Sequence, residues 1–481
     1  MKHNPMSVKY KVSIGLETHV QLKTRSKIWC GCANVFGSEP NTDVCPICLG
    51  YPGTMPVLNR EAVRLTVTTG LMLGCAINRY SKFDRKSYFY PDMPKNYQIS
   101  QYDLPLCLGG SVSIEVDGKP KTIRIHRIHL EEDVAKNNHF EQSSGVDFNR
   151  AGTPLMEIVS EPDIESAEEA FAFLVALKQM LVYGGISDCN LEQGNMRCDL
   201  NCSVRPEGQT TLGTKTEIKN MNTFKGVHRS LSHEIKRQIE VLSQGGTIRQ
   251  ETRRWDDAAE VTRSMRSKEY AHDYRYFPEP DLMPVVLAEE EIEGWKKALP
   301  EMPAHRRERL VAEYGLPEYD AGVLVADKAV ADYFEEVARG SANPKAASNW
   351  MMTEMLRALS EQELEIGQVR MPPESLAGLI RLVDAQVLNA PGAKEVFAIL
   401  FEQGGDPNKI VEEKGLAQVS DSGALDAWVE EAVAANAKSV ADYQAGKKAA
   451  LQFLMGQVMR ASKGKANPPM VLDALRKRLG G

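Results

Sequence analysis

Several features are missing from this chain, and each absence removes a class of protein. No apolar run approaches the length of a membrane-spanning helix, and the first residues, MKHNPMSVKYKVS, lack the apolar core of a signal peptide. We therefore expect a cytoplasmic protein with no membrane segment. Neither G-x-x-x-x-G-K-[ST] nor G-x-G-x-x-G occurs, so a P-loop and a Rossmann fingerprint are both excluded. The zinc deaminase pattern is also missing, because His19 follows Glu17 instead of preceding it.

Cysteine is scarce, with nine residues in 481, and a reducing compartment suits this usage better than a disulfide framework. Four of the nine are clustered as a C-x-C pair and a C-x-x-C pair, Cys30, Cys32, Cys45 and Cys48. Two close thiolate pairs can complete a tetrahedral zinc site and leave no open position for water. The spacing predicts a structural zinc ion that stabilises a loop; unrelated free thiols are the alternative.

The length and the charge distribution indicate several domains and a polyanionic partner. A chain of 481 residues is too long for one ordinary core, and 42% apolar with 26% charged residues is typical of a soluble globular protein. The net charge is −7, yet eight basic residues and one acid follow Gln444. A basic end on an acidic body suggests that this end binds a polyanion.

The segment from Val8 to Leu22 has the clearest periodicity in the chain. Apolar residues occupy the even positions with one exception, and polar residues occupy the odd ones. Such alternation predicts a β-strand with one buried face. Glu17 and His19 project side by side from the other face and could begin a metal or acid–base site. A merely solvated strand face is the alternative.

A second strand is expected in KTIRIHRIHLEEDVAKN. Its apolar phase changes from odd to even positions near Arg127, which indicates a β-bulge. Three acids follow, Glu131, Glu132 and Asp133, and such a concentration of charge is costly without a cation nearby. Because neighbouring residues point to opposite faces, only one glutamate can face a given metal. An exposed acidic turn is the alternative here.

Three further stretches contribute to this part of the chain. SKFDRKSYFYPDMPKNYQISQYD interleaves basic and aromatic residues, which commonly meet phosphates, although a solvated loop is also consistent with its prolines. MRCDLNCSV alternates so that Cys198 and Cys202 should lie in the core, with Arg197 and Asp199 on the other face. GTKTEIKNMN likewise exposes Glu217.

Strands separated by few helices predict an α+β fold. We expect a mainly antiparallel sheet in residues 1–290, whose polar face forms a cradle lined by functional groups. Composition then becomes rich in Ala, Leu and Glu, which predicts an all-helical domain at 291–407 and a small basic helical tail domain at 408–481.

Eight phrases in order resemble the B subunit of the aspartyl/glutamyl-tRNA amidotransferase family. They are IGLETHVQL, the cysteine cluster, KFDRKSYFYPDMPKNYQISQ, HLEEDVAK, DFNRAGTPLMEIVSEPD, MRCDLNCSV, GTKTEIKNMN and DYRYFPEPD. The likeness also covers the tail phrase GKKAALQFLMGQVMRASKGKANP. Each phrase alone is weak, but their order makes the resemblance specific.

The resemblance implies a ligase that forms carbon–nitrogen bonds during protein biosynthesis. Glutamate or aspartate mischarged on tRNA(Gln) or tRNA(Asn) would be phosphorylated by ATP, and ammonia would then displace the phosphate. It also implies a heterotrimer, in which the amidase (A) subunit releases ammonia from glutamine and the small (C) subunit joins the two larger chains. A non-discriminating aminoacyl-tRNA synthetase is a further expected partner. No serine–lysine amidase cluster is recognisable here, so we expect no glutaminase activity from this chain alone.

The same resemblance suggests roles for particular residues. Magnesium ligands are expected at motif positions, with Glu17 and Glu132 the strongest candidates and manganese the alternative because one position is histidine; the set is Glu17, His19, Glu131, Glu132 and Glu217. Arg85 and Lys86 are candidates for the ATP phosphates, and Asp199 for orienting ammonia. Glu17, His19, Glu132 and Asp199 are thus the expected catalytic residues. The expected tRNA-binding residues are Lys447, Lys448, Arg460, Lys463 and Lys465.

Two other function classes are consistent with parts of the sequence. A non-catalytic tRNA-binding protein would need a basic surface throughout, which the ordered carboxylates near His19 argue against. A metal hydrolase built on Glu17, His19 and Glu132 would cleave an ester without ATP. ATP consumption that depends on charged tRNA distinguishes the ligase from both.

Overall fold

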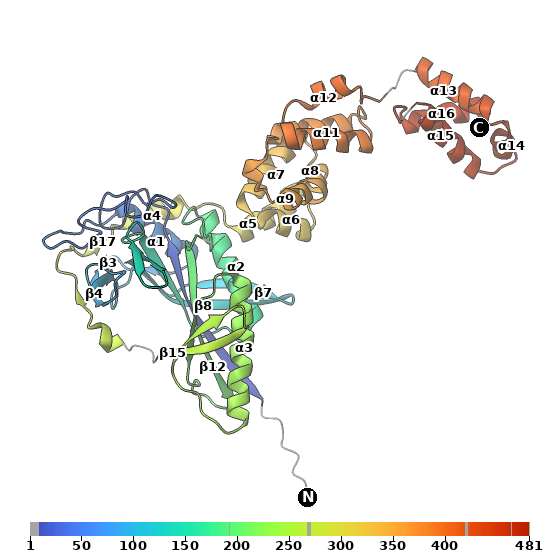
Figure 1. Ribbon diagram of the computed structural model, residues 1–481. Helices are drawn as coiled ribbons and strands as arrows, with labels where there is room; N and C mark the ends of the chain where they lie inside the picture. Colours follow the sequence, from blue (N-terminus) through green and yellow to red (C-terminus); the bar gives the residue numbers. More distant parts are fainter. Residues whose placement is uncertain (1–8, 192, 267–270, 419–421, 463, 481) are drawn as a thin grey trace, which may run out of the picture. The chain divides into compact units, whose positions relative to one another are not determined.

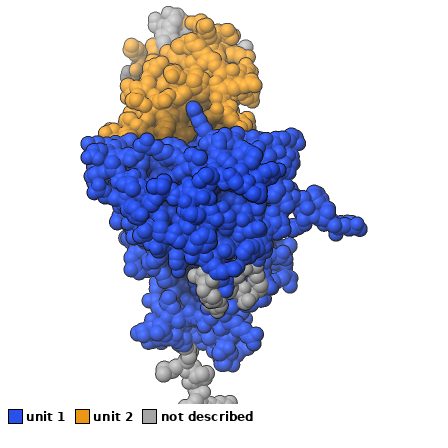
Figure 2. Space-filling view, turned by 90° about the vertical axis from the view of Figure 1, so that its left-hand side faces the viewer, with its two compact units in different colours: residues 1–303 blue, residues 304–481 orange. Residues whose placement is uncertain are grey.

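The computed structural model describes residues 9–191, 193–266, 271–418, 422–462 and 464–480. The chain divides into two compact units, Met1–Pro303 and Ala304–Gly481, coloured separately in Figure 2. The sequence places the boundary at residue 290, but helix α4 (Glu289–Lys297) buries Ile292 in the core of the first unit. The first unit therefore continues past this helix to Pro303.

The first unit is built on one large sheet, as the sequence predicts (Figure 1). Its strands lie in the order β15 (Val261–Arg266), β14 (Thr252–Asp256), β13 (Thr216–Lys219), β12 (Met196–Pro206), β1 (Tyr10–Gln21), β11 (Pro154–Ser160), β8 (Lys119–Glu132), β6 (Cys107–Leu108) and β2 (Ala76–Ile77). Strand β7 (Ser111–Val116) pairs with β8 outside this order. Only β13 and β14 pair in parallel among the described strands. The predicted α+β fold with a mainly antiparallel sheet is confirmed.

Strand β1 lies inside this sheet, between β11 and β12. Its even residues, from Ile14 to Val20, are buried, and Ile14, Leu16 and Val20 belong to the hydrophobic core. The alternation in the sequence is confirmed from Ile14 to Leu22, whereas before it Tyr10 and Val12 are half-buried and Ser13 is buried; Val8 lies outside the described residues. The predicted bulge in β8 is also confirmed, because the β11 partner changes from Arg127 to Ile125 between adjacent residues.

Helices cover the apolar face of the sheet and begin at residues whose side chains cap them. Asn59 caps α1 (Arg60–Met72), Ser166 caps α2 (Ala167–Tyr183) and Thr223 caps α3 (Phe224–Ser243) by accepting hydrogen bonds from first-turn N–H groups.

Smaller sheets complete the unit: β9 (Lys136–His139) with β10 (Ser144–Asp147), β16 (Phe277–Pro278) with β4 (Asp84–Ser87) and β5 (Tyr97–Ser100), and β17 (Val285–Val286) with β3 (Tyr80–Ser81). A 3₁₀ turn, η1, spans Ala271–Tyr274. The aromatic segment is thus partly a hairpin, β4–β5, and not only a loop.

The second unit is helical where it is described, and it contains two separate hydrophobic cores. The first core extends from Leu310 to Val411 and is built by α5 (Pro303–Tyr314), α6 (Glu318–Val325), α7 (Lys328–Ser341), α8 (Pro344–Trp350), η2 (Met351–Met355), α9 (Leu356–Gln362), η3 (Ile366–Gln368), α10 (Pro373–Asp384), α11 (Ala390–Gln403) and α12 (Pro407–Lys414). The second core, from Leu425 to Leu479, is built by α13 (Ser422–Ala435), α14 (Ala437–Gln444), α15 (Ala449–Ala461) and α16 (Pro468–Leu479). No described helix has the length and apolarity needed to cross a membrane.

Candidate active site and zinc centre

Charged and polar side chains from several strands meet on the polar face of the large sheet. His19 on β1 lies opposite Glu157 on β11, and Glu157 lies opposite His129 on β8. On the other side of β1, Glu17 lies opposite Asp199 on β12. Glu17 and His19 therefore each contribute to a different cluster, because β1 has functional neighbours on both sides.

The histidine cluster consists of His19, His129, Glu131 and Glu157. Nε2 of His19 lies 3.7 Å from a carboxylate oxygen of both Glu131 and Glu157. Nε2 of His129 lies 3.0 Å from Glu157 Oε2. His129 and Glu131 are only 3% and 2% exposed, and the side chains of His19 and Glu157 are 18% and 13% exposed, so the cluster opens to solvent only at His19 and Glu157.

The bulge in β8 explains why His129 and Glu131 face this cluster. Before the bulge the odd residues Ile123 and Ile125 lie in the core, whereas after it the even residues Ile128 and Leu130 do. One extra residue exchanges the two faces of the strand. Without it, His129 and Glu131 would point into the core.

Charge within the histidine cluster is balanced by its own members and by Lys86. Burial opposes ionisation of Glu157, but His129 and His19 together hold its pKa below the ordinary value. Burial likewise opposes the charged form of His129, and the two glutamates outweigh this effect and raise its pKa to about 9. Burial also opposes the charge of Lys86, yet Glu131 keeps the pKa of this lysine above the ordinary value. The carboxylates of the cluster therefore favour the positively charged forms of His129 and Lys86.

The acidic cluster consists of Glu17, Asp199 and Glu217. Asn201 donates a hydrogen bond of 2.8 Å to Glu17, and Thr252 donates one of 2.8 Å to Glu217. Lys219 Nζ lies 2.5 Å from Asp199 Oδ2 and 3.6 Å from Glu217 Oε1. Loss of solvent opposes the charge of Lys219, but the acids outweigh this effect and raise its pKa. One lysine thus partly neutralises three carboxylates.

The structure places Glu132 away from both clusters. Its carboxylate oxygens lie 2.7 and 2.6 Å from Lys95 Nζ, and the backbone N–H of Ile99 donates to it at 2.9 Å. Glu132 continues the buried face of Leu130, so it points away from Glu131. Of the two strongest ligand candidates, Glu17 and Glu132, the structure places only Glu17 in a carboxylate cluster, and Glu131 is the glutamate that lies beside His19.

The two basic residues expected at the ATP phosphates have different surroundings. Arg85 donates to both oxygens of Glu279 at 2.7 and 2.9 Å and to Asp281 at 3.0 Å, with its guanidinium 4.3 Å from the ring centre of Tyr97. These contacts occupy the guanidinium and join Arg85 to the segment that contains Glu279 and Asp281. Lys86, in contrast, lines a hollow of about 140 Å³ together with His19 and Glu131.

Sequence reasoning does not identify Glu157, His129 or Arg197 as site residues. Arg197 also lines the hollow beside Lys86 and lies 2.9 Å from the buried carboxylate of Asp133. A signal for Glu157 exists, since it alternates with the buried Met156 and Ile158 on β11. The partners of this strand cannot be derived from that alternation alone.

Both clusters are compatible with a divalent cation. In each cluster three side chains offer atoms within 4.8 Å of one another, His19, Glu131 and Glu157 in one and the three acids in the other. Octahedral magnesium at about 2.1 Å keeps its ligand atoms about 3.0 to 4.2 Å apart, so small side-chain movements would suffice. The acidic cluster offers only oxygen and matches magnesium best, whereas the histidine cluster adds one imidazole nitrogen.

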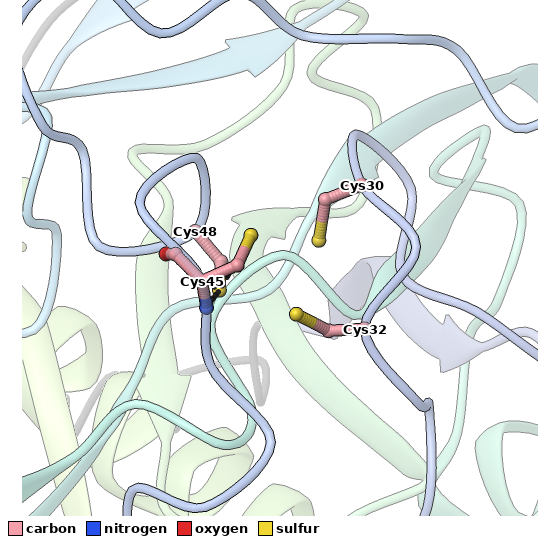
Figure 3. A group of neighbouring side chains, drawn as sticks. All are labelled: Cys30, Cys32, Cys45 and Cys48. Atoms are coloured by element: carbon pink, nitrogen blue, oxygen red, sulfur yellow. Dashed lines mark hydrogen bonds between the residues drawn. The ribbon is translucent and has the colours of Figure 1, made fainter.

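The four clustered cysteines come from two loops, and their sulfur atoms point toward a common centre (Figure 3). All four Sγ atoms lie within 4.8 Å of one another, and Cys45 and Cys48 are separated by 3.8 Å. Tetrahedral zinc with bonds of about 2.3 Å requires sulfur atoms about 3.8 Å apart. A shared hydrogen bond lowers the pKa of Cys48 to about 4 and raises that of Cys30, while burial raises the pKa of Cys32 to about 11. The geometry fits the expected zinc ion.

A fully buried lysine, Lys27, lies beside this cysteine cluster. Its side chain has no exposed surface, and its Nζ donates to the carbonyl oxygen of Phe148 at 3.2 Å. Its backbone N–H donates to Cys32 O at 3.0 Å. Its side chain and that of Cys48 both pack next to the Cα of Gly152. Its positive charge also lowers the pKa of Cys48. Four thiolates around zinc carry a net negative charge, which this buried ammonium would offset.

Replacing Lys27 by methionine should lower zinc affinity about tenfold to a hundredfold, because the charge that offsets the thiolates is lost while the length of the side chain is kept. Competition with a chelator measures the affinity. The control is Lys23→Met, which removes a lysine whose side chain is 61% exposed and should leave the affinity unchanged. Equal zinc affinity in Lys27→Met and the parent would show that Lys27 is only a packing residue.

The expected tRNA-binding residues lie on the surface of the tail. Lys447, Lys448, Arg460 and Lys465 are all exposed, and Lys463 lies outside the described residues. Lys447 forms an ion pair of 2.9 Å with Asp442. Since the tail has its own core, these exposed side chains are positioned by a folded support.

Comparisons with known proteins cover nearly the whole chain. The family model of the GatB/GatE catalytic domain matches residues 12–293, and that of the GatB domain matches residues 332–479. The chain is similar to the B subunit of the aspartyl/glutamyl-tRNA(Asn/Gln) amidotransferase of Caldanaerobacter subterraneus, with 55% identity over 98% of this chain and 100% of the relative. Proteins of the same name from Thermoanaerobacter sp. and Syntrophotalea carbinolica share 54% and 49% identity, over 98% and 99% of this chain and all of theirs. The likeness covers both the sheet unit with its two clusters and the helical unit, and the chain belongs to the family of aspartyl/glutamyl-tRNA(Asn/Gln) amidotransferase B subunits.

Proposed function

We propose that this chain, as one component of a tRNA-dependent amidotransferase, carries out both chemical steps of the amidation. The side-chain carboxylate of glutamate or aspartate, esterified to tRNA(Gln) or tRNA(Asn), takes the terminal phosphoryl group of ATP. ADP leaves, and an acyl phosphate forms. Ammonia then attacks the carbonyl carbon, and the bond between this carbon and the phosphate oxygen breaks. Phosphate is released, and the amide product stays attached to the tRNA. The products are Gln-tRNA(Gln) or Asn-tRNA(Asn).

The observation that carries this proposal is the pairing of two carboxylate clusters with cations on one face of the sheet. Phosphoryl transfer needs positioned charge more than a protein nucleophile, because negative charge spreads over the phosphate oxygens in the transition state. A cation held by these carboxylates would provide such charge, together with Lys86 and Arg197, which line a hollow beside Glu131. The absence of a P-loop in the sequence is consistent with a nucleotide held mainly through metal and side chains.

In this proposal His19, Glu131 and Glu157 hold one magnesium ion, and Glu17, Asp199 and Glu217 hold a second. A bound divalent cation would supply charge that neutralises the phosphate oxygens of ATP; manganese is the alternative where His19 is a ligand. Lys86 and Arg197 contact the phosphates from the protein side. Glu132 supports the hairpin β4–β5 through Lys95, and Arg85 holds the segment around Glu279.

Asp199 also orients the incoming ammonia through its oxygen atoms. Lys219 Nζ lies 2.5 Å from Asp199 Oδ2, so the other oxygen of this carboxylate can accept a hydrogen bond from ammonia. The ammonia comes from glutamine through the partner amidase (A) subunit, and the small (C) subunit joins the complex. A non-discriminating synthetase supplies the mischarged tRNA.

The test uses the full chain, Glu-tRNA(Gln) or Asp-tRNA(Asn), ATP, magnesium and ammonia. We expect ADP release that depends on the mischarged tRNA, together with an equal yield of amide. Glutamine alone should not replace ammonia unless the partner subunits are added. Ester hydrolysis without ATP would contradict the proposal and would favour a metal hydrolase, whereas tRNA binding without ADP release would favour a binding protein.

The tail should contribute affinity for tRNA and not chemistry. Replacing Lys448, Arg460 and Lys465 by glutamine should raise the Michaelis constant for tRNA. The slope of the logarithm of the binding constant against the logarithm of the salt concentration should become shallower by about 2 to 3, because each phosphate contact contributes nearly one unit to it. Turnover at saturating tRNA should stay close to that of the parent. Lys236→Gln, an exposed lysine of α3, is the control. A large fall in saturated turnover would instead place the tail in the catalytic step.

A further inference from the structure

A groove of about 950 Å³ lies on the first unit, and none of its lining residues belongs to the clusters described above. It is formed by α2, α3 and the end of the β7–β8 hairpin, and α2 contacts both of the other elements. Figure 1 shows α2 and α3 running side by side. Phe171 and Val175 of α2 line the groove and are 36% and 43% exposed. The floor is thus apolar and open to solvent.

Helix α2 is apolar on two sides, although only one side is covered by the sheet. Phe173, Leu174, Leu177 and Leu181 are buried in the core. The outer side carries further apolar residues, Phe171, Ala172, Val175 and Ala176. A helix that is hydrophobic all round is normally covered all round. Phe171 contacts the ring of Phe224 at its edge, but among the described residues of the first unit the outer side of α2 has the composition of a buried surface and stays partly open to solvent.

The spacing on this outer side suits contact with another helix. Phe171 and Val175 are four residues apart and form a ridge, while Ala172 and Ala176 beside them form a shallow row. Ridges of this kind pack into the grooves of a second helix. Two turns of helix, with a diameter of about 10 Å and a pitch of 5.4 Å, occupy ~850 Å³. The groove is therefore large enough to take part of a helix of this size.

The two walls of the groove carry opposite charges. Glu115 and Asp117 are exposed on the hairpin side, and Lys225 is exposed on the α3 side. No ion pair involves these three residues within the part of the chain that the structure describes. In contrast, His228 lies 3.0 Å from Glu168 across the groove lining. The unpaired charges call for a basic row on one flank of the occupant and an acidic residue on the other.

We propose that the groove binds an amphipathic helix of a partner subunit of the same enzyme. Its apolar residues, spaced three and four apart, lie on Phe171 and Val175. Its basic flank faces Glu115 and Asp117, and an acidic residue faces Lys225. The assignment of the partner to the same enzyme rests on the proposed function. The groove and its charges are observed independently of that function.

The first test is photo-crosslinking in the assembled complex. A benzophenone amino acid replaces Val175 in the full chain, which is coexpressed with the amidase and small subunits. We expect a crosslink to a partner peptide with the predicted apolar spacing and flanking charges. The matched control is the same replacement at Val286, which is 71% exposed on β17 and should not reach that peptide. A crosslink to a second copy of this chain, to a peptide without that pattern, or no crosslink at all would overturn the proposal.

The second test measures partner affinity in Val175→Glu, with Val175→Gln as a milder variant. A charge placed in the apolar contact should weaken partner binding about tenfold or more. Val286→Glu should change it less than about twofold. Glutamine-dependent amidation should fall, whereas ammonia-dependent amidation by the chain itself should not. Parent affinity in both Val175 variants would refute the groove, while a failure of ammonia-dependent amidation in the parent would refute only the proposed function.

Discussion

Replacing Glu131 by glutamine should reduce tRNA-dependent ADP release at least about a hundredfold. The change keeps the shape of the side chain but removes one of the charges that would hold a divalent cation beside His19 and Glu157. Phosphoryl transfer depends on positioning and on charge neutralisation, so loss of the cation's position is costly. Amide formation should fall by the same factor, because the acyl phosphate precedes ammonia attack. The measurement is ADP release beside amide yield, with ammonia supplied directly.

The adjacent residue provides a demanding control. Glu132→Gln removes the charge partner of Lys95, whose side chain is 13% exposed, and breaking a buried pair of this kind costs about 3 to 5 kcal/mol. We therefore expect a lower melting temperature but near-parent ADP release per folded molecule. The reverse outcome, in which Glu132→Gln loses ADP release at parent stability and Glu131→Gln does not, would restore Glu132 as the ligand.

The local features of the sheet unit were predictable from the sequence because they follow from short-range periodicity. The alternation around Glu17 and His19 predicts a strand with one polar face, and the phase change near Arg127 predicts the bulge. The same phase also contains the information that selects Glu131, since Ile128 and Leu130 define the buried face that Glu132 continues. The resemblance includes both glutamates, and the phase of the strand places Glu131, not Glu132, on the same face as His129.

What could not be predicted depends on contacts between distant segments. Glu157 and His129 join His19 only because β11 pairs with both β1 and β8, and no pattern within one segment specifies that register. Arg85 is another example. Its basic–aromatic context suggests phosphate binding, but Glu279, far along the chain, occupies its guanidinium. Composition shows that a charged side chain is present, but it does not show with which residue that side chain forms an ion pair.

The domain boundary illustrates the same limit. Helical composition begins near Glu291, but Ile292 is buried with the sheet unit, so the change in composition precedes the change in packing. The cysteine cluster is the opposite case, because its ligands lie within one short stretch. Its spacing alone predicts a geometry in which all four sulfur atoms converge.

Replacing Glu17 by glutamine should also lower ADP release about a hundredfold, but for a separable reason. Asn201 donates to Glu17 at 2.8 Å and can keep this hydrogen bond with the new amide oxygen, so the fold of the acidic cluster should persist. The lost charge weakens cation binding, and higher magnesium concentrations should therefore restore part of the rate. Lys11→Gln, an exposed change on the same strand, should have no such effect.

Combining Glu17→Gln with Glu131→Gln tests whether the two clusters serve one step. Changes in groups that act together are not additive, so the double variant should lose much less than the product of the two single losses. Independent effects would multiply instead, to about ten thousandfold. If Glu17→Gln alone releases ADP at the parent rate, the acidic cluster does not hold a catalytic cation, and the chemistry must rest on the histidine cluster, with Lys86 and Arg197 as the remaining positive charges at the phosphates.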